Sequence, residues 1–127
     1  MATWHLAARG PAPADEAWRR YEEIQLWPTW APQISRVRAS SDQLALGVTG
    51  TVYVLGLLPF PFTVTSCHLE SRTWSWLVRI GPIEIALTHA VEVDGPGSRT
   101  TLDIEGPAPV VYAYAPVARL ALGRLVR

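Results

Sequence analysis

The chain has 127 residues and a formal net charge of zero, and 49% of its residues are hydrophobic against 17% that are charged. This length predicts one domain, residues 1–127, with a substantial apolar core, and the eleven basic residues, all arginine, are too dispersed to indicate a nucleic-acid partner. The single cysteine, Cys67, excludes an internal disulfide and a cysteine-based zinc site.

The first thirty residues predict a strand, a helix and a stiff aromatic segment. Residues 3–9 alternate between apolar and polar side chains, which indicates a short strand. Residues 14–24 carry an apolar stripe at helical spacing, with acidic residues where the first turn of a helix favours them. The segment Trp27-Pro28-Thr29-Trp30 then places two tryptophans around a proline. We interpret it as a short second helix whose tryptophans pack into the core at one end of a sheet.

The middle of the chain predicts consecutive antiparallel strands separated by turn residues. The candidate strands are 34–39, 44–55, 62–69, 73–80, 83–93 and 99–105. Residues after Pro107 predict a closing helix that runs to the C-terminus. Pro116 lies inside it and should kink the helix or split it in two.

This order of elements resembles the polyketide cyclase/dehydrase group of the SRPBCC superfamily, which has the START and birch-pollen-allergen-like fold. The residues that carry the resemblance are 12–18, the segment Trp27-Pro28-Thr29-Trp30, Gly47, residues 97–100 and Gly106-Pro107. The resemblance implies an α+β helix-grip fold, in which a curved antiparallel seven-stranded sheet wraps around a long C-terminal helix, with two short helices after the first strand. It also implies an apolar cavity between the sheet and the last helix.

Alternation along the strands assigns an inner face that is rich in valine, isoleucine and tryptophan. We expect a hydrophobic ligand to contact Trp4, Val52, Trp74, Trp76, Leu87, Thr100 and Leu102 on this face, and Leu58 and Phe60 at the cavity entrance. The two inner tryptophans of residues 73–80 either stack on an aromatic ligand or fill the cavity themselves. Strand 62–69 alternates too poorly for its face to be assigned.

His89 and Tyr114 are the candidate catalytic residues. His89 is the titratable side chain that alternation places on the inner face, and imidazole is an effective general acid or base near neutral pH. The alternative is a neutral buried histidine bonded to Tyr114 or to a backbone carbonyl. Tyr114, on the inner face of the last helix, either donates to a substrate carbonyl or points its hydroxyl to water at the cavity mouth.

The segment 55–62 is too apolar for an ordinary hairpin tip, which predicts a lid, a membrane-touching tip or a contact in a homodimer. No cofactor is indicated, and the three histidines stand apart from any carboxylate at the spacing of a metal site. The chain start lacks the regions of a signal peptide, and no apolar run is long enough to span a membrane. We therefore expect a cytoplasmic protein.

The resemblance implies a polyketide cyclase/aromatase-like protein that binds a hydrophobic, polycyclic or polyketide-derived small molecule. His89 and Tyr114 would then move protons in an aldol-type cyclisation or a dehydration. Catalytic members of the family usually place arginine or other polar groups in the cavity, whereas the inward positions of strand 44–55 are valine and glycine and no arginine is assigned to the inner face. The alternatives are a non-catalytic carrier or sensor of a lipid, quinone or similar hydrophobic ligand, and a filled cavity in a protein that serves as a structural interface.

Overall fold

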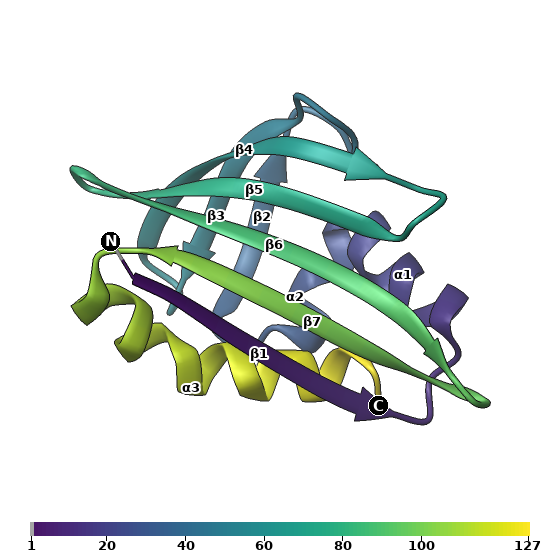
Figure 1. The fold of residues 1–127 in the computed structure, drawn as a ribbon. Helices are drawn as coiled ribbons and strands as arrows, with labels where there is room; N and C mark the ends of the chain where they lie inside the picture. The colour runs from purple at the N-terminus through teal and green to yellow at the C-terminus, as the bar shows by residue number, and fades with distance from the viewer. Residues whose placement is uncertain (1) are drawn as a thin grey trace.

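The computed structural model describes residues 2–127. One antiparallel sheet has the strand order β1-β7-β6-β5-β4-β3-β2. The elements are β1 (Ala2–Gly10), α1 (Ala14–Glu22), the 3-10 turn η1 (Ile24–Leu26), α2 (Trp27–Trp30), β2 (Ile34–Ala39), β3 (Thr49–Val54), β4 (Leu58–His68), β5 (Thr73–Ile80), β6 (Ile83–Asp94), β7 (Gly97–Gly106) and α3 (Ala108–Leu125). The sheet curves around α3, which contacts β1 and β7 (Figure 1). Helices α1 and α2 lie behind the sheet in this view, where α1 contacts β6 and β7 and α2 contacts β2. The predicted helix-grip α+β fold is confirmed.

The tryptophans of α2 attach this short helix to the end of α1. The indole Nε1–H of Trp27 donates to the carbonyl of Tyr21 at 2.9 Å, and that of Trp30 donates to the carbonyl of Arg20 at 3.0 Å. Carbonyls in the last turn of a helix lack partners within the helix, so these bonds satisfy groups that the end of α1 would otherwise leave unpaired. Trp27 is buried and its ring contacts the rings of Phe62 and Trp74. The interpretation of this segment as a core-packing helix is confirmed.

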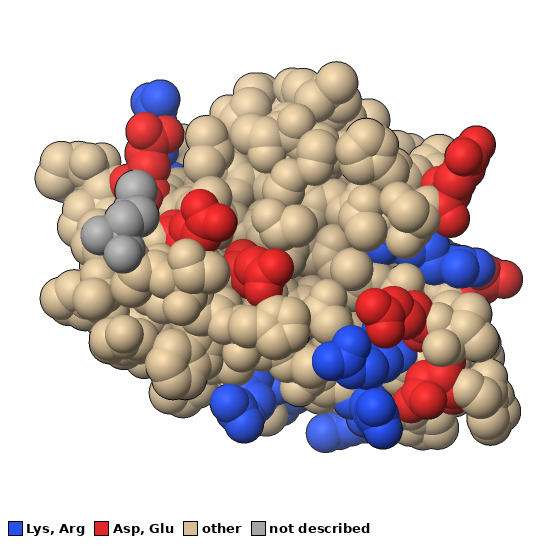
Figure 2. Space-filling view, viewed as in Figure 1, with Lys and Arg blue, Asp and Glu red and all other residues tan. Residues whose placement is uncertain are grey.

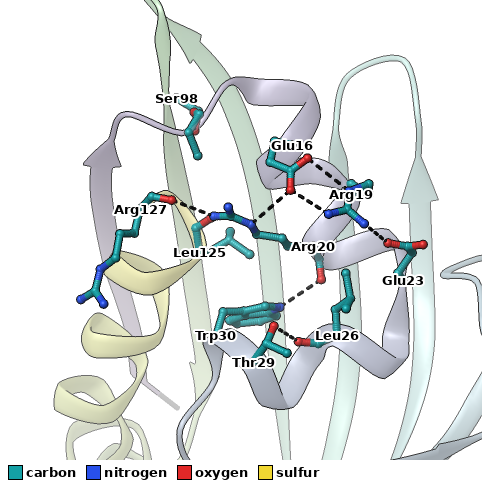
Figure 3. A network of polar contacts seen from close by, with 11 residues as sticks. Glu16, Arg19, Arg20, Glu23, Leu26, Thr29, Trp30, Ser98, Leu125 and Arg127 are labelled. Carbon is teal, nitrogen blue, oxygen red and sulfur yellow. Dashed lines mark hydrogen bonds and ion pairs between the residues drawn. The ribbon is translucent and has the colours of Figure 1, made fainter.

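Arg20 joins α1 to the end of α3. Its Nη1 donates to the backbone carbonyls of Leu125 at 2.6 Å and Arg127 at 3.1 Å, as Figure 3 shows. The neighbouring Arg19 pairs with Glu16 and Glu23 on the exposed side of α1. On the face seen in Figure 2, the arginines gather along the α3 side and at the right-hand end, where acidic side chains lie among them. This face therefore carries no extended area of positive charge.

Strand β4 begins earlier than the predicted strand 62–69, and it includes Pro59 and Pro61. The strand begins at Leu58 and pairs with β3 from there, whereas its pairing with β5 begins only at Phe62. Both prolines therefore lie where β4 has a partner on one side only, so their missing N–H groups cost the sheet no hydrogen bond on the free side. The exposed turn is reduced to residues 55–57.

Three further features of the structure were not predicted: the start of β3, a bulge in β4 and the continuity of α3. Strand β3 begins at Thr49 rather than residue 44, after Gly47 has taken a φ of 86°. A register shift between Val64 and Ser66 makes Thr65 a bulge, and this extra residue explains why strand 62–69 alternates poorly. Helix α3 continues through Pro116 without a break, so the proline does not split it. Within residues 2–127, no helix is both long enough and apolar enough to cross a membrane.

Candidate ligand-binding cavity

A cavity of about 190 Å³ lies between the inner face of the sheet and α3. Its wall is drawn from β2 to β6, the residue before β2, the β3–β4 turn and α3. The lining residues are Gln33, Ile34, Val52, Val54, Leu55, Phe60, Trp76, Val78, Ile80, Ile85, Leu87, Tyr114 and Val117. In the described part of the chain, this wall contains no charged side chain and no histidine. Such a wall suits an uncharged apolar molecule.

The cavity opens at the β3–β4 turn, because Leu55 belongs to the wall and is also 76% exposed. Leu55 and Gly56 both have positive φ, 55° and 81°, a combination that hairpin turns usually build from Asn-Gly. A leucine with positive φ is strained because its Cβ approaches the following carbonyl. Two hydrogen bonds hold the turn in place: Leu55 N–H donates to the carbonyl of Gln33, and Gly56 N–H donates to Ser35 Oγ, each at 3.1 Å.

A polar pair, Gln33 and Tyr114, belongs to this wall. Gln33 Nε2 donates to Tyr114 Oη at 2.9 Å, which joins the residue before β2 to the middle of α3. Burial raises the pKa of the Tyr114 phenol, so this side chain is neutral at physiological pH. Gln33 Oε1 is buried without a hydrogen-bond partner among the described residues. Gln33 is not among the predicted site residues; its one sequence signal is that it is a polar residue directly before the first strand of the meander.

His89 is buried, as alternation predicted, but it does not line the cavity. Its Nε2 lies 3.3 Å from Trp76 Nε1 and its Nδ1 lies 3.1 Å from Tyr21 Oη. An indole N–H only donates, so Nε2 is the acceptor and Nδ1 carries the proton. His89 therefore lies behind Trp76 as seen from the cavity and donates to Tyr21.

The hydrogen bonds continue beyond the imidazole. Tyr21 Oη donates to Thr100 Oγ1 at 2.9 Å, and Thr100 donates in turn to the carbonyl of Ala90 at 2.9 Å. We call the series from Trp76 through His89, Tyr21 and Thr100 to this carbonyl the buried polar chain. Every proton in it has an acceptor, and it ends on the backbone.

The buried polar chain is electrically neutral. Burial lowers the pKa of His89 from 6.5 to about 3 and raises the pKa of Tyr21. Both nitrogens of His89 are occupied by protein groups, so neither is open to a proton from a molecule in the cavity. The arrangement matches the alternative of a neutral buried histidine, with Tyr21 as its partner instead of Tyr114.

The structure brings together five of the predicted site residues and separates the others. Val52, Phe60, Trp76, Leu87 and Tyr114 all line the cavity. Alternation placed Val52, Trp76 and Leu87 on the inner face, and Phe60 was expected at the cavity entrance. Val52 pairs with Phe60 across β3 and β4, and Trp76 pairs with Leu87 across β5 and β6.

Three predicted ligand contacts are buried elsewhere. Trp74 stacks on the ring of His89, with 4.6 Å between ring centroids, and packs against Trp27. Thr100 belongs to the buried polar chain, and Leu102 lies in the core away from the cavity. Trp74 and Thr100 point inward, but Trp27 of α2 packs on the first and Tyr21 of α1 bonds to the second, which alternation along a strand does not reveal.

Two other predicted contacts lie at the surface. Trp4 is 38% exposed and meets Tyr112 edge to face at 5.3 Å, in a groove that Pro116 and Arg119 also line. Leu58 is 48% exposed and does not belong to the wall. Among residues 2–127, no three His, Cys, Asp or Glu side chains are grouped so that they could hold a metal ion.

Comparisons with known proteins agree with this architecture. The model of the family described as "Polyketide cyclase / dehydrase and lipid transport" matches residues 1–127. No curated protein matches the sequence. Among solved structures, the di-domain ARO/CYC BexL from the BE-7585A biosynthetic pathway has a TM-score of 0.82 at 18% identity, over 99% of this chain and 45% of BexL.

Two further structures match over nearly their whole length. Ara h 8.0201 has a TM-score of 0.77 at 11% identity, over 98% of this chain and 94% of that one. An uncharacterized protein from Bacillus thuringiensis has a TM-score of 0.82 at 10% identity, over 98% of this chain and 96% of that one. At these identities the structures show a shared fold. The family match over the whole chain shows that the chain belongs to the polyketide cyclase/dehydrase and lipid transport family.

Proposed function

We propose that the protein binds one small, uncharged, hydrophobic molecule in the cavity and acts as its carrier or sensor. The observation that carries this proposal is the chemistry of the wall. Its one titratable side chain in the described chain is Tyr114, whose pKa is raised above the ordinary value for a phenol. A wall of this kind offers shape and apolar contact, and no acid or base that works near neutral pH.

The volume of the cavity limits the size of the ligand. Its volume of about 190 Å³ is close to the roughly 150 Å³ of a dry protein cavity that holds benzene, and below the range of about 300–1,000 Å³ typical of drug-sized ligands. We therefore propose a compound of one or two rings, or a short acyl chain. A polycyclic polyketide would require the cavity to enlarge.

Cyclisation of a bound substrate has less support. It needs His89 and Tyr114 to act on one molecule, yet Tyr114 lies on the wall and His89 lies behind the indole of Trp76. A proton relay from His89 would require Trp76 to release its bond and move aside. Cyclisation stays the second candidate because the family is described as one of cyclases and dehydrases and because BexL is an ARO/CYC protein.

The apolar tip, which consists of Leu55, Leu57 and Leu58, is exposed beside the mouth. We propose that it acts as a lid, because Leu55 already belongs to the cavity wall. A contact in a homodimer is the other interpretation of the same leucines, and the cytoplasmic location stays a prediction from the sequence.

Filling the cavity tests the proposed function. Val117→Phe adds a ring to the wall from α3, and Val110→Phe is the matched control, because Val110 is half-buried on the same helix but lines a shallow outer groove. We expect naphthalene to bind the wild type and Val110→Phe in calorimetric titration, and to bind Val117→Phe at least about tenfold more weakly. Equal binding by both variants would place the ligand elsewhere. No binding of naphthalene by the wild type, with no co-purifying molecule in native mass spectrometry, would refute the proposal.

A further inference from the structure

The pair formed by Gln33 and Tyr114 has unused hydrogen-bonding capacity. Their bond of 2.9 Å uses one amide N–H of Gln33 and one lone pair of Tyr114 Oη. Among the described residues, the hydroxyl proton of Tyr114 is donated to no other group, and Gln33 Oε1 is buried without a donor. At least one donor, the Tyr114 hydroxyl, and one acceptor, Gln33 Oε1, therefore remain in a wall that is otherwise apolar.

Both orientations of the Gln33 amide leave a free donor and a free acceptor. If its oxygen and nitrogen exchange places, the Tyr114 hydroxyl donates to Oε1, the amide N–H groups become the free donors and Tyr114 Oη keeps a free lone pair. In both arrangements the pair offers a donor and an acceptor side by side. The terminal amide torsion of glutamine has a broad minimum, so a modest rotation brings either atom toward a ligand.

We propose that Gln33 and Tyr114 form a hydroxyl-selecting anchor, so that the cavity prefers phenols and alcohols to hydrocarbons or simple ketones and quinones of the same shape. This inference rests on the proposed function of ligand binding. A hydroxyl group accepts a hydrogen bond and donates one, which matches both free positions. A quinone carbonyl only accepts, and it would leave the acceptor of the pair unsatisfied, while a hydrocarbon would leave both positions unsatisfied.

Charged ligands are selected against at the same place. A carboxylate would need a cation or several N–H donors to offset its loss of hydration. The described wall supplies one titratable group, the neutral Tyr114, and no arginine. The carbonyl of Gln33 accepts from the N–H of Leu55 at the mouth, so the anchor lies at the open end of the cavity. The ligand would therefore hold its hydroxyl near the mouth and its apolar part against Trp76 and Leu87.

Three compounds of one shape class test the anchor: naphthalene, 2-naphthol and 1,4-naphthoquinone. We expect the wild type to bind 2-naphthol about tenfold more tightly than either of the other two, which is the effect of roughly one net hydrogen bond. Tyr114→Phe and Gln33→Leu should each reduce this preference to about twofold or less while their affinity for naphthalene changes little. Gln25→Leu is the matched control, because Gln25 is exposed and lies outside the cavity.

The outcomes separate the two proposals. If the wild type binds none of the three compounds, the proposed ligand binding fails. If it binds naphthalene but has no preference for 2-naphthol, or if the preference survives in Tyr114→Phe and Gln33→Leu, the binding proposal stands and the anchor is refuted. Retained binding of naphthalene shows that a variant has kept the cavity, so either variant alone decides the point if the other fails to fold.

Discussion

His89 makes the stability of the protein depend on pH in a way that the structure predicts in sign and size. Its pKa is 6.5 in the unfolded chain and about 3 in the fold, because burial disfavours the imidazolium. Between these values the unfolded chain binds a proton at this site and the folded protein does not. The contribution of the neutral His89 to the free energy of unfolding is therefore fully present above the pKa of the unfolded chain, and it is lost as the pH falls toward the pKa in the folded protein.

The size of the loss follows from the two pKa values. One pKa unit corresponds to about 1.4 kcal/mol, so the linkage relation gives a loss of about 2 kcal/mol between neutral pH and about pH 5, and about 3 kcal/mol by about pH 4. Tyr21, the titratable side chain bonded to the ring, has a raised pKa and stays neutral over this range. Most small domains have only about 5–15 kcal/mol of stability, so His89 alone makes the fold markedly sensitive to acid.

Urea unfolding of the wild type and His89→Gln between about pH 8 and about pH 4 measures this loss. Glutamine can accept from Trp76 and donate to Tyr21 but does not titrate, so the variant should lack about 2 kcal/mol of the loss at about pH 5. His68→Gln is the control, because it makes the same substitution at an exposed histidine that lies at the end of β4, outside the buried polar chain. Parallel profiles for the wild type and His89→Gln would refute the reasoning.

Two further predictions concern the backbone. Leu55→Asn should raise the free energy of unfolding by about 1 kcal/mol in urea titration, because asparagine tolerates positive φ. The control Leu57→Asn makes the same change at a residue without positive φ, and its free energy of unfolding should stay within about 0.5 kcal/mol of the wild type. Equal effects of the two variants would show that Leu55 is not strained. Gly10→Ala should lower the melting temperature by an amount equivalent to about 2 kcal/mol or more, because a Cβ there would lie 2.1 Å from the carbonyl oxygen of Val126. Gly123→Ala should raise the melting temperature, because Gly123 lies in the last turn of α3 and an added Cβ would meet no atom within 4 Å beyond its chain neighbours and the backbone of its own helix. A shift of the same sign in both alanine variants would contradict this packing.

The fold was predictable because most strands keep a regular alternation. Trp74, Trp76 and Val78 are buried on β5 as their spacing predicted, and Ile85 and Leu87 are buried beside them on β6. The turns between these strands carry residues that act locally, such as Gly81 with its φ of 62°. Information of this kind lies within a few residues along the chain, so it can be read without knowing the tertiary structure.

The predictions that the structure did not match, and the site residue that was not predicted, share a different cause. Pro59 and Pro61 interrupt a strand only if a neighbour needs their N–H groups, and that depends on where β4 begins to pair with β5. His89 was placed inside correctly, but its partner Tyr21 comes from α1, 68 residues earlier in the chain. Gln33 became part of the candidate site because Tyr114, 81 residues later, meets it. Contacts between segments that are distant in the sequence decide which inward residues line the cavity and which pack against a helix.

The pairing of β1 with β7 has a consequence for how the chain folds during synthesis. β1 hydrogen-bonds only to β7, from Ala2 opposite Gly106 to Gly10 opposite Ser98, and its inner side is covered by α3. A ribosome that has made residues 2–10 must make nearly all of the sheet before their partner strand emerges. Loop closure over such a separation slows folding, and contacts of this kind give the topology a high contact order. Strand β1 therefore stays without its partner strand, and its backbone N–H and C=O groups are accessible to chaperones and to other nascent chains, until β7 has left the exit tunnel.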